Sequence, residues 1–434
     1  MAPSRPSCLA TLEVPSLRNT GEESSPAMTQ SLPEHIPGIL TPAFESDPYR
    51  SYALMREEAP LYYDDQLQAY VISRYSDVAR AFKDPAFTNR NYEWQLEPVH
   101  GRTIVQMDGR EHATKRAIVA PCFRPKAILG KLTAIIEGNA VRLVDEFVGR
   151  GSCEFSAEFS RLYPINVTAD MMGLPVEDLE TFRGWYSAII DFLGNLTQDE
   201  AVTQAGLRAR DEMAKYMLPV IAERRRNPGD DLLSTLCAAE VDGVQMSDEE
   251  IKSFASLLLT AGGETTDKVL TSLLAKLVEH PDQLADVRRG RSLIPAALAE
   301  TLRVAPPLHM VMRQTAVDVE IADGAIPAGS TVVCLIASAN RDPAVFSNPD
   351  HFDIHRTDVD ASREFSGASK QLAFVHGRHF CVGSLLAKQE VEVGLNVLLD
   401  RTSDIRLQAG FVPVEEGVFT RAPRKLLLDL TPAP

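Results

Sequence analysis

The segment between Ser247 and His280 constrains the fold more than any other part of the chain. Ser247 and Glu250 match the S-x-x-E capping box that begins many helices, and His280-Pro281 is a typical helix end. The helix predicted over residues 248–279 would be about 48 Å long, at about 1.5 Å per residue. Its flank Leu257-Leu258-Leu259 is apolar nearly all round, so we expect the helix to run through the core.

The middle of this predicted helix, Ala261-Gly262-Gly263-Glu264-Thr265-Thr266, is unusual for a core helix. Each interior glycine destabilises a helix by about 1 kcal/mol relative to alanine, and a buried acid is costly unless it has a partner. A close helix crossing would explain the two glycines but not Glu264. Alternatively, a local kink would leave room for a ligand beside an acid and a hydroxyl group.

The remaining pattern predicts an α+β fold that is mostly α. We expect a β-hairpin over residues 61–73, a mainly helical stretch over 76–305 and another helix over 385–399. Short strands are predicted at 317–321, around the tight turn Asp323-Gly324, at 331–336 and at the end of the chain. Residues 1–32 are rich in Ser, Pro, Thr and Glu and are expected to be a disordered tail, followed by a single domain over 33–434.

The composition excludes several function classes. The chain has 434 residues, with 44 Lys and Arg against 60 Asp and Glu, and the net charge of −16 argues against a general nucleic-acid binder. No apolar run is long enough to cross a membrane, and no secretory signal is recognisable. The six cysteines are scattered, so neither a disulfide framework nor a CxxC zinc pair is expected. We therefore expect a reduced, cytoplasmic monomer that binds neither nucleic acid nor a membrane.

The strongest functional signal is the loop that runs from Phe374 to Gly383 and contains Cys381. A buried, inert cysteine is the simplest interpretation. A zinc site could use His376, His379 and Cys381, but no fourth Cys or His lies at the usual spacing. In the third interpretation Cys381 is a thiolate ligand of haem iron, because it shortly precedes a helix whose free N–H groups favour a thiolate.

This loop resembles the cysteine-ligand loop of the cytochrome P-450 family, F-G-x-G-x-[HR]-x-C-x-G followed four residues later by Ala. The matching positions are Phe374, Gly377, His379, Cys381, Gly383 and Ala387. Val375 replaces the usual glycine, and since a β-branched residue tolerates positive φ poorly, we expect the turn to be reshaped there.

Three further motifs match the family, and their order along the chain is also that of the family. The first is [AG]-G-x-[DE]-T-T over residues 261–266, in the long helix. The second is the pair Glu300 and Arg303 of E-x-x-R, together with Asn348-Pro349-x-x-Phe352 and Arg356. The third is Asp108, His112, Arg116 and Phe123, with Arg110 in place of the family's proline. The resemblance covers about residues 38–434 and implies the cytochrome P-450 fold, a long core helix over haem with small segregated β-sheets.

The resemblance also implies roles for single residues. Cys381 would ligate the iron of haem b, with Phe374 near its sulfur and with Ala261 and Gly383 beside the cofactor. The haem propionates would bind His112, Arg116, Arg313 and His379. Glu264 and Thr265 would be the acid–alcohol pair that delivers protons, whereas Glu300, Arg303 and Arg356 would be a structural ion cluster. The expected substrate contacts are Tyr92, Trp94, Leu257, Met310 and Phe419.

The implied function is that of a monooxygenase, which inserts one oxygen atom from dioxygen into a hydrophobic small molecule such as a secondary-metabolite intermediate. The electrons would come from a ferredoxin and its NAD(P)H-dependent reductase. The ferredoxin would dock near Arg110, Lys126 and Lys131. The alternatives are a peroxide-driven peroxygenase and a non-catalytic haem-binding sensor. Both are disfavoured by Glu264 and Thr265, because neither function needs protons to be delivered to dioxygen.

Overall fold

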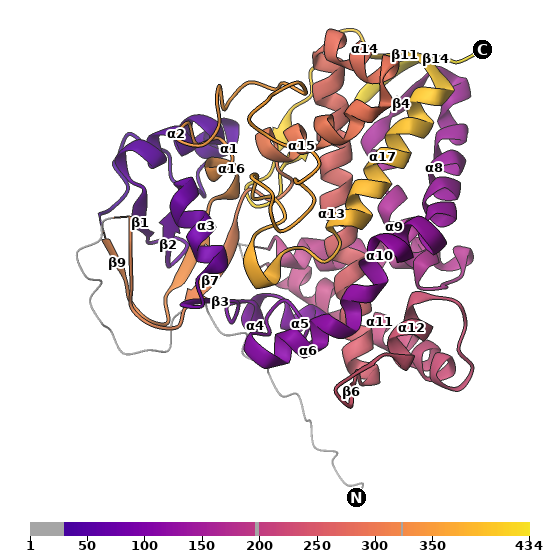
Figure 1. The fold of residues 1–434 in the computed structure, drawn as a ribbon, viewed down its shortest axis with the longest axis horizontal. Coiled ribbons are helices and arrows are strands. Elements are labelled where there is room, and N and C mark those ends of the chain that lie inside the picture. Colours follow the sequence, from indigo (N-terminus) through magenta and orange to yellow (C-terminus); the bar gives the residue numbers. More distant parts are fainter. Residues whose placement is uncertain (1–29, 196–198, 323) are drawn as a thin grey trace, which may run out of the picture.

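The computed structural model describes residues 30–195, 199–322 and 324–434. Figure 1 shows a large helical body beside a smaller part that is rich in β-strands. This is the mostly helical α+β architecture that the sequence predicts. The tail predicted over residues 1–32 lies outside the described residues, apart from its last three, and so does Asp323 of the predicted tight turn.

Two groups of helices make up the α-structure. The first three helices accompany the strand-rich part: α1 (Pro42–Ser46), α2 (Pro48–Glu58) and α3 (Tyr75–Lys83). The others, most of which form the helical body, are α4 (Tyr92–Gln95), α5 (Glu97–His100), α6 (Gly109–Val119), α7 (Pro125–Ala127), α8 (Thr133–Phe147), α9 (Tyr163–Met171), α10 (Leu179–Leu193), α11 (Glu200–Arg226), α12 (Leu232–Ala238), α13 (Asp248–Glu279), α14 (Pro281–Arg289), α15 (Ile294–Val304), α16 (Ile336–Ala339) and α17 (Ser384–Arg401).

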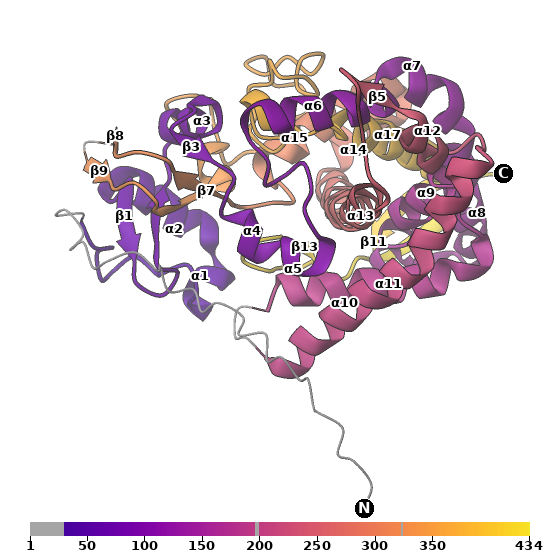
Figure 2. The same ribbon diagram turned by 90° about the horizontal axis from the view of Figure 1, so that it is seen from below.

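Helix α13 is the long helix predicted from the capping box. Ser247 Oγ accepts a hydrogen bond from the N–H of Glu250 at 3.2 Å, and Glu250 Oε2 accepts one from the N–H of Ser247 at 2.8 Å. The helix ends before His280, as predicted. Figure 2 views α13 along its axis, with other helices of the body on several sides of it. Its apolar side chains therefore form part of the main hydrophobic core.

The glycines of α13 meet two different environments. The helix continues across Gly262 and Gly263 without interruption. A Cβ atom on Gly263 would lie 3.0 Å from Tyr186 of α10 and 3.2 Å from Ile165 of α9, whereas Gly262 has no neighbour closer than 3.8 Å. Gly263 thus supports the interpretation as a close helix crossing, while Gly262 is not required by packing.

The main sheet has the strand order β1-β2-β10-β7-β3. Its strands are β1 (Leu61–Asp64), β2 (Ala69–Ile72), β10 (Thr331–Cys334), β7 (Val311–Thr315) and β3 (Phe87–Thr88). Strand β10 is central and buried on both faces: Val332 and Cys334 belong to one apolar cluster, and Val333 belongs to another. The predicted hairpin is confirmed as β1 paired antiparallel with β2.

Four smaller sheets complete the fold of the described residues. Their strands are β11 (Thr402–Leu407), β14 (Leu427–Pro432) and β4 (Ser152–Glu154); β12 (Glu415–Glu416) and β13 (Ala422–Pro423); β5 (Glu240–Val241) and β6 (Val244–Gln245); and β8 (Val319–Ile321) and β9 (Gly324–Ile326). Within the described part of the chain, no helix combines the length and the apolar character that crossing a bilayer requires.

Candidate active site

The cysteine loop is held at both of its ends. The N–H of Cys381 donates to the carbonyl of Phe374 at 2.9 Å, and helix α17 begins three residues later at Ser384. The five described cysteines are unpaired, and Cys381 is the exposed one. Although part of its surface is accessible, the protein groups packed around Cys381 desolvate the thiol and raise its pKa, against the opposing effects of the Gly383 N–H, Arg116 and the Ser384 N–H. The helix N–H groups thus face the sulfur as predicted, but they do not lower the pKa of the free thiol below its ordinary value.

Val375 corrects one prediction about this loop. We expected the turn to be reshaped to avoid positive φ at a β-branched residue, yet Val375 adopts a φ of 51°. Its N–H donates to the carbonyl of Leu372 at 2.9 Å, and its side chain packs against the apolar cluster around Phe82 and Leu372. These contacts hold the left-handed conformation at an expected cost of about 1–3 kcal/mol.

Gly377 brings the same loop against helix α3. Its φ is +72°, and a Cβ atom there would lie 2.5 Å from the carbonyl oxygen of Phe82 and 3.3 Å from the Cα of Lys83. The clash is with backbone, which cannot rotate away as a side chain can. Glycine is therefore required at this position both for its φ and for the close approach.

Polar groups converge beside the cysteine loop. The rings of His112 and His379 lie 4.2 Å apart between centroids, and His379 Nε2 lies 3.1 Å from Asp108 Oδ1. Arg116 donates to the carbonyl of Phe380, which directly precedes Cys381. Arg313 is buried, donates to the carbonyl of Met312 at 2.8 Å and stacks over the ring of Phe82.

The electrostatics of this group keep its histidines neutral. Burial lowers the pKa of His112 to about 4, helped by His379 and Arg116. Burial also lowers the pKa of His379, although Asp108 opposes the shift. His112 Nε2 is buried and has no hydrogen-bond partner within the described structure. An unpartnered polar atom beside buried cations is what an anionic ligand group would satisfy.

The same region does not resemble a zinc site. His376 Nε2 lies 3.2 Å from the hydroxyl of Ser369, whereas His379 faces Asp108. Over residues 30–195, 199–322 and 324–434, no group of three or more His, Cys, Asp or Glu side chains is arranged to hold a metal ion. The zinc interpretation of the loop is therefore not supported.

Helix α13 presents one open position in an otherwise enclosed run. Between Ile251 and Val278 every residue is buried or partly buried except Ala261, which is exposed. One turn later, Thr265 is partly exposed, and its hydroxyl donates to the carbonyl of Ala261 at 2.8 Å. Ala261 and Thr265 therefore lie beside open space next to the middle of a core helix.

Glu264 has three partners from three parts of the chain. The hydroxyl of Tyr186, in α10, donates to Oε2 at 2.5 Å. Lys268 Nζ lies 3.0 Å from Oε1, and the hydroxyl of Thr420 donates to Oε1 at 3.3 Å. None of these partners was predicted from the sequence. Only Lys268 carried a signal, because residues four apart face each other on a helix.

The ion cluster around Glu300 is closed on all sides. Arg303 Nε lies 2.7 Å from Glu300 Oε2, and Arg356 Nε lies 2.9 Å from the same oxygen. Arg303 also donates to the carbonyls of Asn340, Pro349 and His351. Removing one member would leave a buried charge unpaired, at a cost of about 3–5 kcal/mol. This geometry fits a structural role for all three residues.

The five candidate substrate residues fall in different environments. Met310 is buried next to Phe419, because residues 308–310 run beside 419–420 and the N–H of His309 donates to the carbonyl of Phe419 at 2.8 Å. Leu257 is buried in α13, one turn before Ala261. Tyr92 accepts a hydrogen bond from the N–H of Met312 at 3.3 Å, next to Arg313. Trp94 is 42% exposed.

A haem fits this arrangement of residues. Cys381 offers a reachable sulfur, Ala261 lies beside open space, and the buried Arg313 and the unpartnered His112 Nε2 would meet the anionic propionates. Gly377 places the cysteine loop directly against the backbone of helix α3. The donor set of one thiol with neighbouring cations suits a thiolate-ligated iron porphyrin.

Comparisons with known proteins agree with this geometry. The chain matches the cytochrome P450 family over residues 57–403. It is 38% identical over 403 residues to the pulcherriminic acid synthase of Bacillus subtilis (strain 168), covering 92% of this chain and 99% of that protein. Cytochrome P450 CYP109Q5 from Chondromyces apiculatus has a similar structure, with 36% identity, a TM-score of 0.81 and coverage of 91% of this chain and 98% of that one. CYP109E1 from Bacillus megaterium in complex with testosterone is also similar, with 30% identity, a TM-score of 0.78 and coverage of 88% and 99%.

Proposed function

This chain belongs to the cytochrome P450 family and is a haem-binding monooxygenase, and we propose that it inserts one oxygen atom into a hydrophobic small molecule of the secondary-metabolite kind, using electrons from a ferredoxin. The observation that carries the proposal is the open face of α13, where Ala261 and Thr265 lie beside a space rather than against a neighbouring helix.

The haem, when bound, supplies the activation of dioxygen. This chain's own residues hold it and control its surroundings. Cys381 is the proposed iron ligand, and Phe374, whose carbonyl accepts the N–H of Cys381, is the residue proposed to pack near the sulfur and limit its exposure. Arg116, Arg313, His112 and His379 are the proposed partners of the propionates, because they are the cations and ring N–H groups gathered beside the cysteine loop.

Thr265 and Glu264 are the proposed proton-delivery pair. In this structure the Thr265 hydroxyl donates to the carbonyl of Ala261 in its own helix. A rotation about its side-chain bond would turn the hydroxyl toward an acceptor on the open side. Glu264 is held by Tyr186, Lys268 and Thr420, and it would pass protons between water and Thr265. Neighbouring positions on one helix keep the acid and the hydroxyl in a fixed relation.

The proposed substrate is apolar because the residues predicted to contact it are largely apolar. Leu257, Met310 and Phe419 offer no charge and no free hydrogen-bonding group. The similar structure with testosterone bound supports a hydrophobic ligand, and the similar pulcherriminic acid synthase supports a role in making a secondary metabolite. We further propose a cytoplasmic monomer that binds neither nucleic acid nor a membrane.

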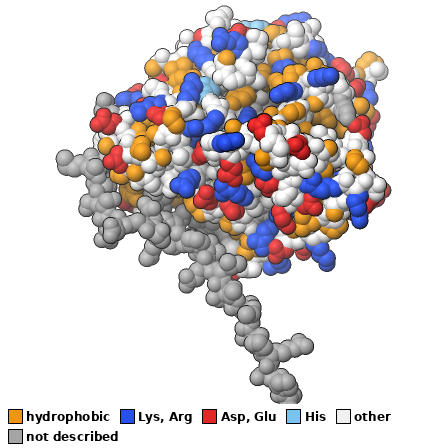
Figure 3. All heavy atoms as spheres, turned by 60° about the horizontal axis from the view of Figure 1, so that its bottom comes forward, with side chains coloured by type: hydrophobic (Ala, Val, Ile, Leu, Met, Phe, Trp, Pro, Cys, Tyr) orange, Lys and Arg blue, Asp and Glu red, His pale blue; other side chains and the backbone are white. Residues whose placement is uncertain are grey.

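The proposed ferredoxin surface is a set of exposed cations on α6 and the segment that follows it, and α6 contacts the cysteine loop through Arg116, which donates to the carbonyl of Phe380. Arg110, Arg124 and Lys126 are exposed and unpaired within the described structure, whereas Lys115 is neutralised by Glu250 at 2.6 Å. The side chain of Lys131, also predicted here, lies outside what the structure describes. Figure 3 shows that basic side chains interrupt the acidic ones on the visible face, so the net charge of −16 does not exclude a local basic surface.

The proposal is tested by turnover with surrogate redox partners. A compound library is first screened for ligands that shift the spin state of the haem. The best ligand is then supplied with a surrogate ferredoxin, its reductase and NAD(P)H, and we expect oxygenated product in step with NAD(P)H consumed. Product from hydrogen peroxide alone, without NAD(P)H-driven product, would show a peroxygenase. Ligand binding without either reaction would show a sensor or carrier.

A further inference from the structure

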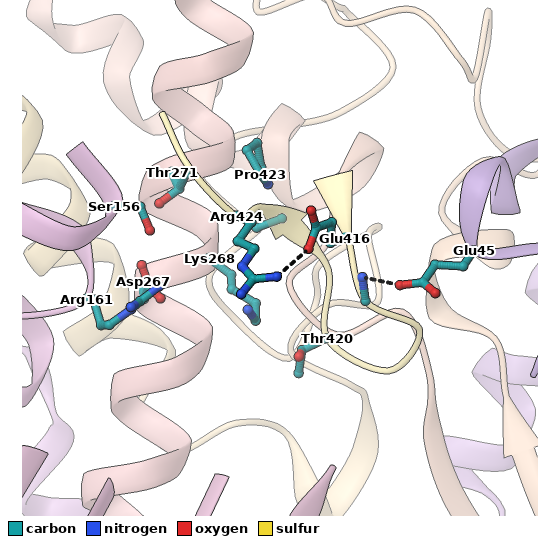
Figure 4. A pocket seen from close by; sticks show the side chains of 12 residues that line it. Glu45, Ser156, Arg161, Asp267, Lys268, Thr271, Glu416, Thr420, Pro423 and Arg424 are labelled. Carbon is teal, nitrogen blue, oxygen red and sulfur yellow. Dashed lines mark hydrogen bonds and ion pairs between the residues drawn. The ribbon is translucent and has the colours of Figure 1, made fainter. Parts of the chain in front are cut away.

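A polar cavity of about 330 Å³ lies against helix α13 next to Glu264. It is bounded by α13, by the helical turn Ser156–Ser160 and by the segment between β12 and β13 (Figure 4). Lys268 and Thr420 line it, and both also contact the Glu264 carboxylate, at 3.0 and 3.3 Å. A cavity of this size holds roughly ten waters at about 30 Å³ each. Glu264 is thus separated from this space, which can fill with water, only by the side chains of Lys268 and Thr420.

A second carboxyl group, Asp267, lies in the wall of this cavity. It is 6% exposed, and its Oδ1 accepts a hydrogen bond from the hydroxyl of Ser160 at 2.6 Å. Ser160 in turn lies 2.7 Å from the hydroxyl of Thr271, another residue of the cavity wall. Figure 4 shows Asp267 and Arg161 pointing toward the same part of the cavity. The proton-delivery pair does not use this buried acid.

The surroundings of Asp267 shift its pKa toward neutral pH. Burial raises its pKa to about 6, and Glu264 raises it further, whereas Ser160, Lys268 and Arg161 act to lower it. Tyr186 faces it from α10, and Glu416 and Arg424 lie across the cavity. Asp267 therefore exchanges its proton with water near physiological pH, which an acid of ordinary pKa does less readily.

We propose that Asp267 is the proton-entry residue of this enzyme, which takes a proton from cavity water and passes it through water to Glu264. The proposal rests on the proposed role of Glu264 and Thr265. Residues three apart on a helix have Cβ atoms about 5–6 Å apart, a separation of the two carboxyl groups that one or two waters can bridge. The step moves one proton from Asp267 to Glu264, and Asp267 regains one from the cavity.

A purely structural role is the competing explanation. The bond between Ser160 and Asp267 ties the turn 156–160 to α13, and its loss would loosen this packing. The two roles separate in two variants. Asp267→Asn keeps an acceptor for Ser160 but carries no exchangeable acid, whereas Ser160→Ala removes the bond and keeps the acid. Proton entry is lost only in the first, and the structural bond is lost only in the second.

The first measurement is an infrared titration of the haem-loaded protein in water and in deuterium oxide. We expect a carboxylic-acid band that disappears with a midpoint near pH 6 in the wild type, and that is missing in Asp267→Asn. Arg161→Gln changes an exposed residue and should raise the midpoint, because it removes a nearby cation. A wild type without this band, or a band unchanged in both variants, would overturn the proposal.

The second measurement is the rate of NAD(P)H oxidation with a surrogate ferredoxin and reductase and no added substrate. Asp267→Asn should be slower by about tenfold or more, with a larger solvent isotope effect, and Ser160→Ala should keep most of the rate. Arg424→Gln, which lines the cavity without contacting either carboxyl group, is the matched control. If Glu264→Gln slows the reaction but Asp267→Asn does not, only this inference fails. If Glu264→Gln has no effect, the proposed delivery pair fails with it.

Discussion

Replacing Gly377 by alanine tests whether the cysteine loop is fixed by its close approach to α3. The added Cβ would lie 2.5 Å from the Phe82 carbonyl oxygen, and the residue has a φ of +72°. The left-handed conformation costs a non-glycine residue roughly 1–2 kcal/mol. Forcing the loop away from α3 adds about 1–3 kcal/mol, the usual cost of overpacking. The expected loss of unfolding free energy is therefore about 2–5 kcal/mol.

Two control variants separate the two costs. Gly410→Ala introduces the same kind of conformation, with φ of +79° and no atom within 4 Å, so it should cost only about 1–2 kcal/mol. Gly367→Ala has neither positive φ nor a close neighbour and should be neutral or slightly stabilising.

The assay is urea unfolding of the haem-loaded proteins, together with the absorption band of the reduced carbon monoxide complex. Gly377→Ala should also lose part of the red-shifted band, because Cys381 moves with the loop. The reasoning is refuted if Gly377→Ala is no less stable than Gly410→Ala and keeps the full band.

Three further predictions concern proton delivery, buried charge and electron supply. Thr265→Ala should keep haem and ligand binding but divert electrons from product into peroxide, measured as peroxide per NAD(P)H; unchanged product yield would remove Thr265 from proton delivery. Burial raises the pKa of Glu390 to about 8, so between about pH 4.5 and 8 the folded state holds a proton that the unfolded state has lost, and the free energy of unfolding falls as pH rises. Urea unfolding at pH 6 and pH 8 should therefore show a smaller fall in the free energy of unfolding for Glu390→Gln than for the wild type. Equal falls in the two proteins would contradict the pKa shift. Arg110→Glu or Lys126→Glu should slow reduction of the haem by ferredoxin, most strongly at low salt, but should leave reduction by dithionite unchanged. Arg406→Glu is the control variant. Equal effects of all three charge reversals on reduction by ferredoxin would place the docking surface elsewhere.

Local signals predicted the elements that local interactions determine. The bounds of α13 follow from the Ser247–Glu250 capping box and from His280-Pro281, all within a few residues of the helix ends. Helix α17 and the first hairpin were predicted for the same reason. The capping box and the hairpin turn are short-range interactions, so the sequence contains all the information they need.

The partners of Glu264 show what such signals miss. Tyr186 and Thr420 lie 78 and 156 residues from Glu264 in sequence, and their meeting depends on how α10 and the β12–β13 segment pack against α13. The prediction for Val375 was wrong for a related reason. Its propensity argues against positive φ, but the turn and the apolar cluster around it outweigh a cost of about 1–3 kcal/mol.

The central claim is that Cys381 is the thiolate ligand of the haem iron, and one measurement tests it most directly. The carbon monoxide complex of the reduced wild type should show the strongly red-shifted band that thiolate ligation produces. Cys381→Ser should lack this band, whereas serine at Cys122, Cys153, Cys237 or Cys334, the other described cysteines, should preserve it. A red-shifted band that survives in Cys381→Ser would contradict the account.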